Sequence, residues 1–591
     1  MAGPQAPAYV LGVGTGPHDG SAALLRDGEL VVMVEQERLS RRRYAMGESP
    51  SAAVHACLDD EGIGVADLDL IAVGWNAPEL AAVEGEEFDE TRFVRWLLGP
   101  SAAERARHVP VHFVDHHLAH AASAFHTSGL PRAAIIVADG RGESVATTLA
   151  VGTPDGIEVL KSWGLEHSLG HFYGWAAEWA GLTSWGAGKL MGLASYGQPR
   201  QQVPLVAGLE DYAVSTAPPP GTPVRLQYAV MRSRLRERFR TANFPFAPAL
   251  SSDVMAYADF AASVQHALEE ALLALARAAR RMTGCDTVVL AGGVALNCAA
   301  NGRLAESGLF REMWIPPVPH DAGVSLGAAL LADRELRGTP RRTYSRMRGA
   351  FWGPRTPRSG PAAIGALAQF DVEECPDGTV ARRTAECLAD GLVVGWWQGR
   401  AEIGQRALGA RSILCDPRRR DLLARVNRIK GREGWRPLAL AVPEEHWGRF
   451  FEGEPPPAAE FMLTTRPLRE AATRTVPAGV HVDGTTRPQV VRPAQTAFHR
   501  MLLDFHELSG VPTVINTSFN LAGEPMVLAR GDAVETFLRS GLDVLVLDNV
   551  MVRRPGSPPP RTRAPRQRGL SFTPWNRSAA TEAAGTGGDA G

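Results

Sequence analysis

The chain has 591 residues, of which 45% are hydrophobic and 21% charged, and this predicts a folded protein with two or three hydrophobic cores. The formal net charge is -2 and no long block of one charge occurs, which argues against nucleic acid or an anionic membrane as an obligate partner. No apolar run approaches the ~20 residues of a membrane span, no signal-peptide pattern opens the chain, and the cysteines lack CxxC spacing. We therefore expect a soluble, reduced, cytoplasmic protein with no membrane and no nucleic-acid partner.

The order of strand and helix patterns predicts an α/β fold. Residues 9–41 read as three strands of a β-meander, with a hairpin turn at Asp27. Residues 133–140 then predict a buried strand, and 259–282 an amphipathic helix. Residues 287–297 predict a strand that passes through a glycine turn into another helix. No internal repeat is visible in the sequence.

Composition marks the domain boundaries. The stretch from about 336 to 362 is rich in Pro, Gly and Arg, as linkers are. The last stretch has the composition of a disordered tail. We therefore predict a first domain at 1–345, a linker at 346–362, a second α/β domain at 363–553 and a disordered tail at 554–591.

Two histidines four residues apart indicate a metal site. If VHFVDHHLAHAASAF is helical, His116 and His120 share one face and reach one ion, while His117 points elsewhere. Asp139 at the end of a predicted strand and Asp321 before a glycine-rich turn are acidic residues of the kind that hold metals. Such a set suits Fe(II), Mn(II) or Zn(II). Packing or capping is the alternative for the two histidines, and helix capping accounts equally well for Asp321, so the spacing alone leaves both interpretations open.

Glycine turns suggest phosphate binding. Gly292 and Gly293 follow a predicted strand and open a helix, where backbone N–H groups and the helix dipole favour an anion. Asn297 lies one turn further and can reach a ribose or base. A second glycine-rich stretch, TSWGAGKLMGLASYG, carries Lys189. The alternatives are a tight strand-to-helix connection and a flexible surface loop.

Basic residues of the second domain recur among glycines and apolar residues, which predicts a shared anion pocket. Only three of the 62 basic residues are lysines, and two of these, Lys189 and Lys430, fall in the densest motifs, as expected where an ammonium group is required. Asn516 and Ser518 can recognise a carbamoyl NH₂ and C=O. A solvated face is the alternative for any single arginine. The basic residues are Arg400, Arg406, Arg411, Lys430, Arg432, Arg436 and Arg487.

Eight motifs between about residues 9 and 550 resemble, in order and spacing, the carbamoyltransferase family typified by NodU and CmcH, which includes antibiotic O-carbamoyltransferases. They are PHDGSAAL, DHHLAHAASAF, GKLMGLASYG, AGGVALN, QGRAEIGQRALGARSIL, REGWRPLA, HVDGTTRPQ and NTSFNLAGEP. The resemblance implies an actin- and sugar-kinase-like (ASKHA, TsaD-like) ATPase domain fused to a C-terminal YrdC-like α/β domain. The chain departs from the family pattern at Gln405, where proline is common, and at Ala410, where asparagine is common.

The resemblance also implies a reaction. ATP, taken with Mg, and carbamoyl phosphate as co-substrate give a carbamoyl-adenylate in the second domain, and the first domain transfers the carbamoyl group to a hydroxyl of a small-molecule acceptor. The Ala-, Arg- and Gly-rich composition points to a high-GC bacterial genome, and thereby to a secondary metabolite such as an antibiotic as acceptor.

The resemblance assigns roles to particular residues. His18 is the implied catalytic base or orienting group, since an imidazole accepts a proton near neutral pH. The implied ligands of iron or another divalent metal are His116, His120, Asp139 and Asp321. The implied nucleotide contacts are Gly140, Lys189, Gly292, Gly293 and Asn297. The implied carbamoyl phosphate and ATP contacts are Arg406, Arg411, Lys430, Arg436, Arg487, Asn516 and Ser518.

Three other functions are weighed against this one. A tRNA-modifying threonylcarbamoyl-type transferase shares the first domain, but no basic patch is present for RNA. A metallopeptidase is suggested by HxxxH alone, but the glutamate of HExxH is missing. An ATP-dependent binding or chaperone protein has no use for a carbamoyl phosphate pocket.

Overall fold

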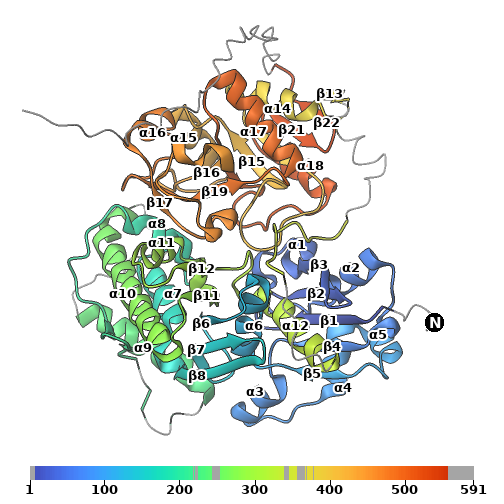
Figure 1. The fold of residues 1–591 in the computed structure, drawn as a ribbon, viewed down its shortest axis with the longest axis vertical. Helices are drawn as coiled ribbons and strands as arrows, with labels where there is room; N and C mark the ends of the chain where they lie inside the picture. Colours follow the sequence, from blue (N-terminus) through green and yellow to red (C-terminus); the bar gives the residue numbers. More distant parts are fainter. Residues whose placement is uncertain are drawn as a thin grey trace, which may run out of the picture.

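The computed structural model describes residues 7–556, except 217, 220, 221, 223, 242–252, 338–344, 356–366, 368 and 377. Its described elements form two five-stranded sheets in the first domain and one eight-stranded sheet in the second, with helices packed on them (Figure 1). This arrangement confirms the α/β class. Most of the predicted tail, at 557–591, and part of the predicted linker, at 356–362, lie outside the described residues.

The first sheet has the order β3-β2-β1-β4-β5. Its first three strands are antiparallel, while β4 and β5 run parallel to β1. The tight hairpin turn places both Asp27 and Gly28 at positive φ, 53° and 75°, as a two-residue hairpin requires. The predicted meander is therefore confirmed. The strands are β1 (Tyr9–Gly14), β2 (Ser21–Arg26), β3 (Glu29–Glu35), β4 (Leu70–Val73) and β5 (Val111–Phe113).

The second sheet repeats the first. Its order is β8-β7-β6-β11-β12. Neighbouring strands among β6, β7 and β8 are antiparallel, while β11 and β12 run parallel to β6, as β4 and β5 run parallel to β1 in the first sheet. The sequence did not reveal this repeat, because it lies in the order and direction of strands and not in their residues. The strands are β6 (Ala133–Ala138), β7 (Val145–Thr153), β8 (Gly156–Gly164), β11 (Thr287–Ala291) and β12 (Glu312–Trp314).

Two helices, α6 (His116–Ser128) and α12 (Val324–Arg337), lie between the two sheets and pack on each other (Figure 1). Their backbones approach closely at Gly327, where a Cβ atom would lie 1.8 Å from the carbonyl oxygen of Ala119. This approach brings the start of α12 beside the start of α6, where the candidate site lies. The predicted amphipathic helix is confirmed as α10 (Ala258–Thr283), which covers β6 and β7, and α2 (Ser51–Glu61) covers β2 and β3.

Shorter elements complete the first domain. The remaining helices are α1 (Gln36–Ser40), α3 (Ala77–Glu84), α4 (Glu90–Leu98), α5 (Pro100–Arg105), α7 (Leu169–Trp179), α8 (Ala187–Ala194), α9 (Val224–Thr241) and α11 (Cys298–Glu306). Single 3₁₀ turns that matter for the site are η1 (Arg43–Ala45), η5 (Gly293–Leu296) and η6 (Asp321–Gly323). A small hairpin pairs β9 (Leu205–Ala207) with β10 (Tyr212–Val214).

The second domain is built on a mixed sheet of order β13-β22-β21-β14-β15-β20-β16-β19. The adjacent residues Trp396 and Trp397 point to opposite faces of this sheet, so each is buried in a different apolar cluster. The strands are β13 (Asp371–Glu374), β14 (Val394–Trp397), β15 (Arg411–Cys415), β16 (Ala439–Pro443), β19 (Pro488–Val491), β20 (Val514–Ser518), β21 (Val544–Leu547) and β22 (Val550–Arg553). The helices are α14 (Val380–Ala389), α15 (Arg420–Ile429), α16 (Glu470–Thr475), α17 (Thr496–Ser509) and α18 (Arg530–Arg539), and β17 (Arg466–Pro467) pairs with β18 (Thr485–Thr486).

The described part of the predicted linker, 346–355, is packed between the domains. The Met33 N–H donates to Trp352 O (2.9 Å), and the Ile403 N–H donates to Ala350 O (2.8 Å), so the segment bonds to both domains. The proposed domain boundaries stay predictions. Among the described helices, none has the length and apolar character needed to cross a bilayer.

Candidate active site

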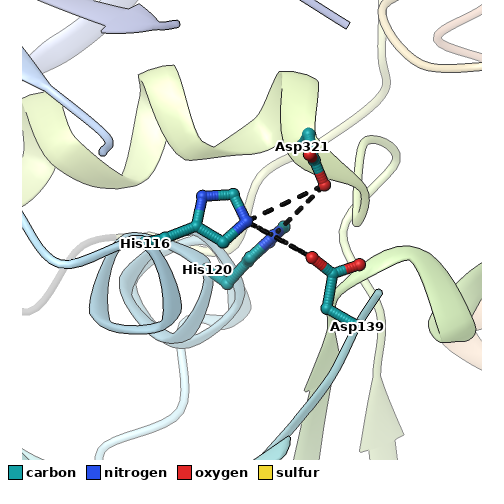
Figure 2. Close-up of side chains that lie close together, drawn as sticks. All are labelled: His116, His120, Asp139 and Asp321. Atoms are coloured by element: carbon teal, nitrogen blue, oxygen red, sulfur yellow. Dashed lines mark hydrogen bonds and ion pairs between the residues drawn. The ribbon is translucent and has the colours of Figure 1, made fainter. Parts of the chain in front are cut away.

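Four buried side chains of the first domain converge on one point. His116 and His120 come from α6, Asp139 follows β6, and Asp321 opens the turn before α12 (Figure 2). The two Nε2 atoms lie 3.1 Å apart, and the nearest carboxylate contact joins His116 Nε2 to Asp139 Oδ2 at 3.3 Å. Asp321 Oδ1 lies 3.8 Å from His116 Nε2 and 3.7 Å from His120 Nε2. The sequence-predicted metal ligands are thus brought together.

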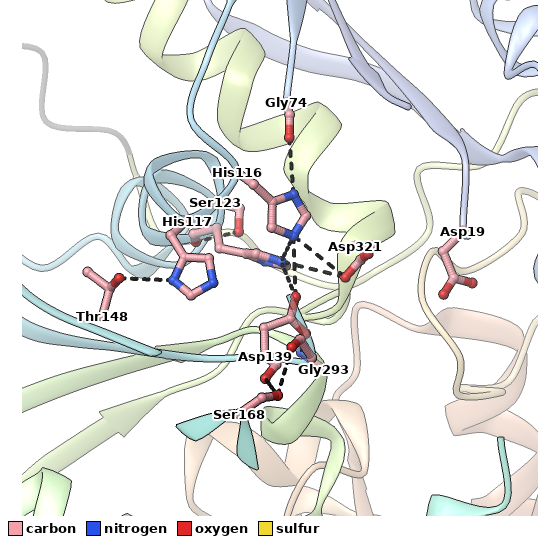
Figure 3. A network of polar contacts seen from close by, with 12 residues as sticks. Asp19, Gly74, His116, His117, Ser123, Asp139, Thr148, Ser168, Gly293 and Asp321 are labelled. Atoms are coloured by element: carbon pink, nitrogen blue, oxygen red, sulfur yellow. Dashed lines mark hydrogen bonds and ion pairs between the residues drawn. The ribbon is translucent and has the colours of Figure 1, made fainter. Parts of the chain in front are cut away.

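The start of α6 explains how the two imidazoles come to face the same point. The helix begins at His116, so residues four apart lie one above the other. His116 Nδ1 donates to the Gly74 carbonyl (3.2 Å), which fixes its proton there and leaves Nε2 turned toward the carboxylates. His117 points away, as expected from the sequence, and its Nδ1 lies 2.9 Å from Thr148 Oγ1 (Figure 3).

The glycine turn after β11 holds Asp139. Gly292 has φ 88°, and a Cβ atom there would lie 2.2 Å from Ala138 O, so only glycine fits. The next N–H group, that of Gly293, donates to Asp139 Oδ1 at 2.7 Å (Figure 3). The sequence suggests phosphate binding at this glycine turn. In this structure, the turn donates a hydrogen bond to the carboxylate of Asp139 instead.

The four side chains form one electrostatic unit. Burial opposes charge on Asp139, but hydrogen bonds with His116 and His120 hold the pKa of its carboxyl well below the usual range. Burial likewise opposes charge on His120, but Asp139 and Asp321 outweigh it and raise the pKa of the imidazole to about 9. Two carboxylates thus stabilise positive charge at this point, whether it is carried by protons or by a cation.

The geometry fits a divalent metal ion. One ligand atom from each of the four residues lies within 4.8 Å of the others. Ligands at ~2.1 Å from one ion are separated by roughly 3–4 Å, as most of these atoms are. The second nitrogen of His116 is held by a backbone carbonyl, which is the usual outer partner of a metal-binding histidine.

His18 lies beside the four-residue cluster, in the turn between β1 and β2. Its Nδ1 is 3.0 Å from Asp19 Oδ2 and 3.8 Å from Asp321 Oδ2, and its side chain is 27% exposed. Burial disfavours the charged imidazole, but Asp19, Asp321 and Asp139 together raise its pKa to about 9. The residue predicted to be catalytic thus has both solvent access and contact with the cluster.

Besides Gly292 and Gly293, the predicted nucleotide contacts form hydrogen bonds with other groups of the protein. Asn297 caps α11 by accepting from the Ala300 N–H (3.0 Å), and it pairs with Gln265. The Gly140 carbonyl accepts from Ser168 Oγ at 2.7 Å. Lys189 reaches across the domain boundary to Glu433, with Nζ 2.7 Å from Oε1. A nucleotide role for these residues stays a prediction.

A cavity of about 260 Å³ lies between the two domains. Its walls are strongly cationic, which fits an anionic ligand. Arg406 Nε, Arg487 Nε and Asn516 Oδ1 are buried there without a hydrogen-bond partner among the described residues, so three polar atoms are left for a ligand. The basic lining residues are Arg38, Arg43, Arg406, Arg432, Arg436 and Arg487, joined by Asn516 and Ser518.

Lys430 lies next to the lining residue Ser518. Its ammonium group donates to Ser518 O and, at 2.7 Å, to Asn520 Oδ1. Burial, together with the charges of Arg432, Arg436 and Arg43, holds the pKa of Lys430 well below its usual range. A bound anion would relieve this repulsion, so the cluster is prepared for negative charge.

Arg411 is placed away from the cavity, unlike Arg406, Arg436 and Arg487, which line it. Its guanidinium donates to the carbonyl oxygens of Leu528 (3.0 Å), Gln398 (2.9 Å) and Gly399 (2.9 Å). It also stacks on Trp397, with Cζ 3.9 Å from the ring centre. Carbonyl oxygens already occupy its donors, so Arg411 holds loops together and does not face the anion pocket.

Several residues at the two sites escaped the sequence analysis. Arg43 of the first domain lines the cavity between the domains, and Glu433 pairs with Lys189. Tyr44 also lines the cavity and stacks on Trp185, which contacts His18. No local motif reveals such contacts, because they join segments about 140 to 390 residues apart.

Two models of one protein family match the chain. Residues 79–330 match the family model described as carbamoyltransferase N-terminus, and residues 385–554 match that described as carbamoyltransferase C-terminus. Nodulation protein NolNO of Sinorhizobium fredii is 36% identical, over 91% of this chain and 79% of its own. Nodulation protein NolO of Bradyrhizobium diazoefficiens is 36% identical, over 75% of this chain and 80% of its own. The chain belongs to the carbamoyltransferase family and is a transferase enzyme.

Among solved structures, full-length HypF in its phosphate- and nucleotide-bound form overlaps 57% of this chain and 56% of its own. The identity is 16% and the TM-score 0.36, which is too low to establish a shared fold.

Proposed function

We propose that this enzyme is an ATP-dependent O-carbamoyltransferase that works through a carbamoyl-adenylate. The second, YrdC-like domain makes the adenylate from carbamoyl phosphate and ATP, and the first domain transfers the carbamoyl group to an acceptor hydroxyl. The repeated strand order of the first domain supports an ATPase domain of the actin and sugar-kinase type.

The single observation that carries the proposal is the cationic cavity between the domains. Six arginines line it, while only three acidic residues do, namely Glu37, Asp483 and Glu524. Carbamoyl phosphate and the ATP phosphates are polyanions, and guanidinium forks match phosphate oxygens. Asn516 and Ser518 add an amide and a hydroxyl for the carbamoyl group.

The chemistry balances over two stages. In the first, carbamoyl phosphate and water give carbamate and phosphate, and a carbamate oxygen attacks the α-phosphorus of ATP, which releases pyrophosphate. In the second, the acceptor oxygen attacks the carbamoyl carbon of the adenylate, its proton is removed, and AMP leaves. Lys430 and the arginines stabilise the phosphate charge of the first stage.

The first domain supplies the groups for the second stage. His18 is the group that positions the acceptor hydroxyl, since it lies beside the cluster and reaches solvent. Because its pKa is raised to about 9, it accepts the hydroxyl proton only after it has lost its own. His116, His120, Asp139 and Asp321 would hold iron or another divalent ion, taken with MgATP as the other cofactor. When bound, such an ion supplies a Lewis acid near the carbonyl or phosphate oxygens.

The acceptor class in this proposal is a hydroxylated secondary metabolite, such as an antibiotic. The experiment is incubation of the enzyme with ATP, carbamoyl phosphate and a panel of hydroxylated natural products, followed by mass spectrometry. A mass gain of one carbamoyl group is expected in at least one compound, and it disappears with His18→Gln while pyrophosphate release continues. Loss of pyrophosphate release in His18→Gln would contradict the division of labour between the domains.

A further inference from the structure

One acidic side chain in the wall of the cationic cavity keeps a carboxylate oxygen for a ligand. Of the three acidic lining residues, Asp483 accepts from a backbone N–H and a hydroxyl of its own turn, at 2.9 and 2.7 Å. Glu524 pairs with Arg539 at 2.7 Å. Among the described residues, the nearest cation to Glu37 is Arg38, whose Nε lies 3.7 Å from Oε1 and thus beyond hydrogen-bond distance.

The backbone of a neighbouring turn fixes the Glu37 carboxylate in position. Tyr44 N–H donates to Glu37 Oε2 at 2.7 Å. Tyr44 has φ 65°, a conformation that bulky side chains rarely adopt and that persists only where the surroundings enforce it. The Glu37 side chain is 15% exposed, and a carboxylate accepts several hydrogen bonds, so Oε1 is left to accept one from a bound molecule.

Glu37 shares its wall of the cavity with groups that attract phosphate. Arg43, the residue before Tyr44, lines the same cavity. Burial lowers the pKa values of Lys430 and Arg436, and the positive charge of Arg43 contributes to both shifts. The carboxylate therefore belongs to the same wall as the cations that we propose to bind carbamoyl phosphate.

The surroundings of Glu37 favour the uptake of a proton. Burial raises the pKa of its carboxyl above the usual range, against the opposing effects of Arg38 and of the Tyr44 N–H. The carboxylates of Asp19 and Glu35 raise this pKa further. A general base is most effective when its pKa lies near the working pH, so Glu37 is better suited to this role than an exposed glutamate.

We propose that Glu37, supplied by the first domain, is the general base that activates the water attacking carbamoyl phosphate in the first stage. The proposal rests on the proposed function and adds a catalytic residue to it. The water oxygen attacks the carbamoyl carbon while Glu37 Oε1 takes one of its protons. The C–O bond to the phosphate then breaks, the phosphate leaves with the electron pair, and Glu37 returns the proton to the departing oxygen. The remaining carbamic acid loses a proton to solvent and becomes the carbamate that attacks ATP.

His481 is the other lining residue of a type that serves as a general base. Its ring lies edge-on to that of Tyr196, with 5.4 Å between the centres, and its Nδ1 lies 3.8 Å from Asp483 Oδ2. Tyr196 comes two residues after the end of α8, so His481 packs against a different segment of the first domain from the one that carries Glu37. The two candidates are therefore separable by mutation.

Carbamate supplied from solution separates the proposed step from the steps that follow it. Carbamate forms in mixtures of ammonium and bicarbonate, and it enters the reaction after the step that needs the base. With carbamoyl phosphate and ATP, Glu37→Gln should release phosphate and pyrophosphate about 10²- to 10⁴-fold more slowly, the usual contribution of a general base. With ammonium, bicarbonate and ATP, the same variant should release pyrophosphate at the wild-type rate, which also shows that it is folded.

Glu178→Gln is the matched control. Glu178 lies on α7, its side chain is 20% exposed and it pairs with Arg232. This variant should equal the wild type in both assays, because it removes the charge of a part-buried glutamate that does not line the cavity.

The possible outcomes distinguish the proposal from the proposed function. Unchanged carbamoyl phosphate-dependent release in Glu37→Gln overturns the proposal, and an equal loss in both assays shows that Glu37 acts on the nucleotide or on folding instead. Loss confined to the carbamoyl phosphate assay in His481→Gln, with Glu37→Gln at the wild-type rate, assigns the base to His481. A wild type that uses carbamoyl phosphate but not carbamate refutes the step given to Glu37. Absence of carbamoyl phosphate-dependent pyrophosphate release in the wild type would instead refute the proposed function.

Discussion

The Nε2 atoms of His116 and His120 face each other at 3.1 Å, with Asp139 and Asp321 beside them and almost no solvent contact. Two ring nitrogens approach this closely only if a proton or a cation lies between them. The two buried carboxylates supply the negative charge that stabilises either the proton or the cation.

His120→Ala should therefore remove the metal without disturbing the second domain. We expect metal affinity to fall by more than the roughly 10- to 100-fold that loss of an outer partner produces. Inductively coupled plasma mass spectrometry measures the metal content, and pyrophosphate release should stay at the wild-type rate. His117→Ala is the control. Because the His117 side chain points to Thr148 and away from the cluster, this variant should keep the wild-type metal content. A wild-type metal content in His120→Ala shows that the ligand set is wrong.

Metal affinity should depend on pH. The pKa of His120 is raised to about 9, so below this pH the metal-free imidazole carries a proton that the ion must displace. As the pH falls from 9 to 6, affinity should decrease about tenfold per unit for each proton displaced, and it should level off above 9. Competition with a chelator at several pH values measures this slope. Affinity that does not change over this range contradicts a protonated His120 in the metal-free site.

Lys430→Met should abolish carbamoyl phosphate-dependent pyrophosphate release. The methionine keeps the length of the side chain but removes the ammonium group near the anion pocket. A loss of at least 100-fold is expected, which corresponds to about 2.7 kcal/mol in the barrier. Lys161→Met is the matched control, because Lys161 pairs with Asp211 on the first domain, at the surface. Thermal unfolding checks that both variants fold, and a folded Lys430→Met with unchanged release rules out this site assignment.

The contact between Lys189 and Glu433 can be tested by a charge swap. The pair is about one-third exposed on each side, so breaking it should change the free energy of unfolding by only about 0–1 kcal/mol. We expect Lys189→Glu and Glu433→Lys each to slow carbamoyl transfer, and the double variant to recover it, as an interdomain ion pair requires. A double variant as slow as the singles indicates that the Lys189 ammonium acts on the nucleotide instead.

Local patterns of the sequence were sufficient for part of the fold and the site. The HxxxH spacing predicted a shared helical face because helical periodicity is a local property, and α6 carries it. The meander and the strand before Gly292 were predicted for the same reason. The repeated strand order of the two sheets was not predicted, because the equivalent strands have unrelated sequences.

Contacts between distant segments could not be predicted in the same way. Arg411 lies in a motif with other arginines, yet its donors meet backbone carbonyls, and only the packing of β15 against neighbouring loops decides this. Trp185 lies in a glycine-rich stretch that suggests a flexible loop, yet it contacts His18 from a segment more than 160 residues away. Residue type states what a side chain can bind, but the fold decides which partner it meets.

The most direct test of the account follows the α-phosphate of ATP. The enzyme is incubated with ATP labelled at the α-phosphorus, with and without carbamoyl phosphate, and the labelled products are separated. We expect labelled carbamoyl-adenylate without acceptor and labelled AMP with it, both dependent on carbamoyl phosphate, together with pyrophosphate. Labelled ADP as the product, or AMP formed equally without carbamoyl phosphate, would contradict the carbamoyl-adenylate route.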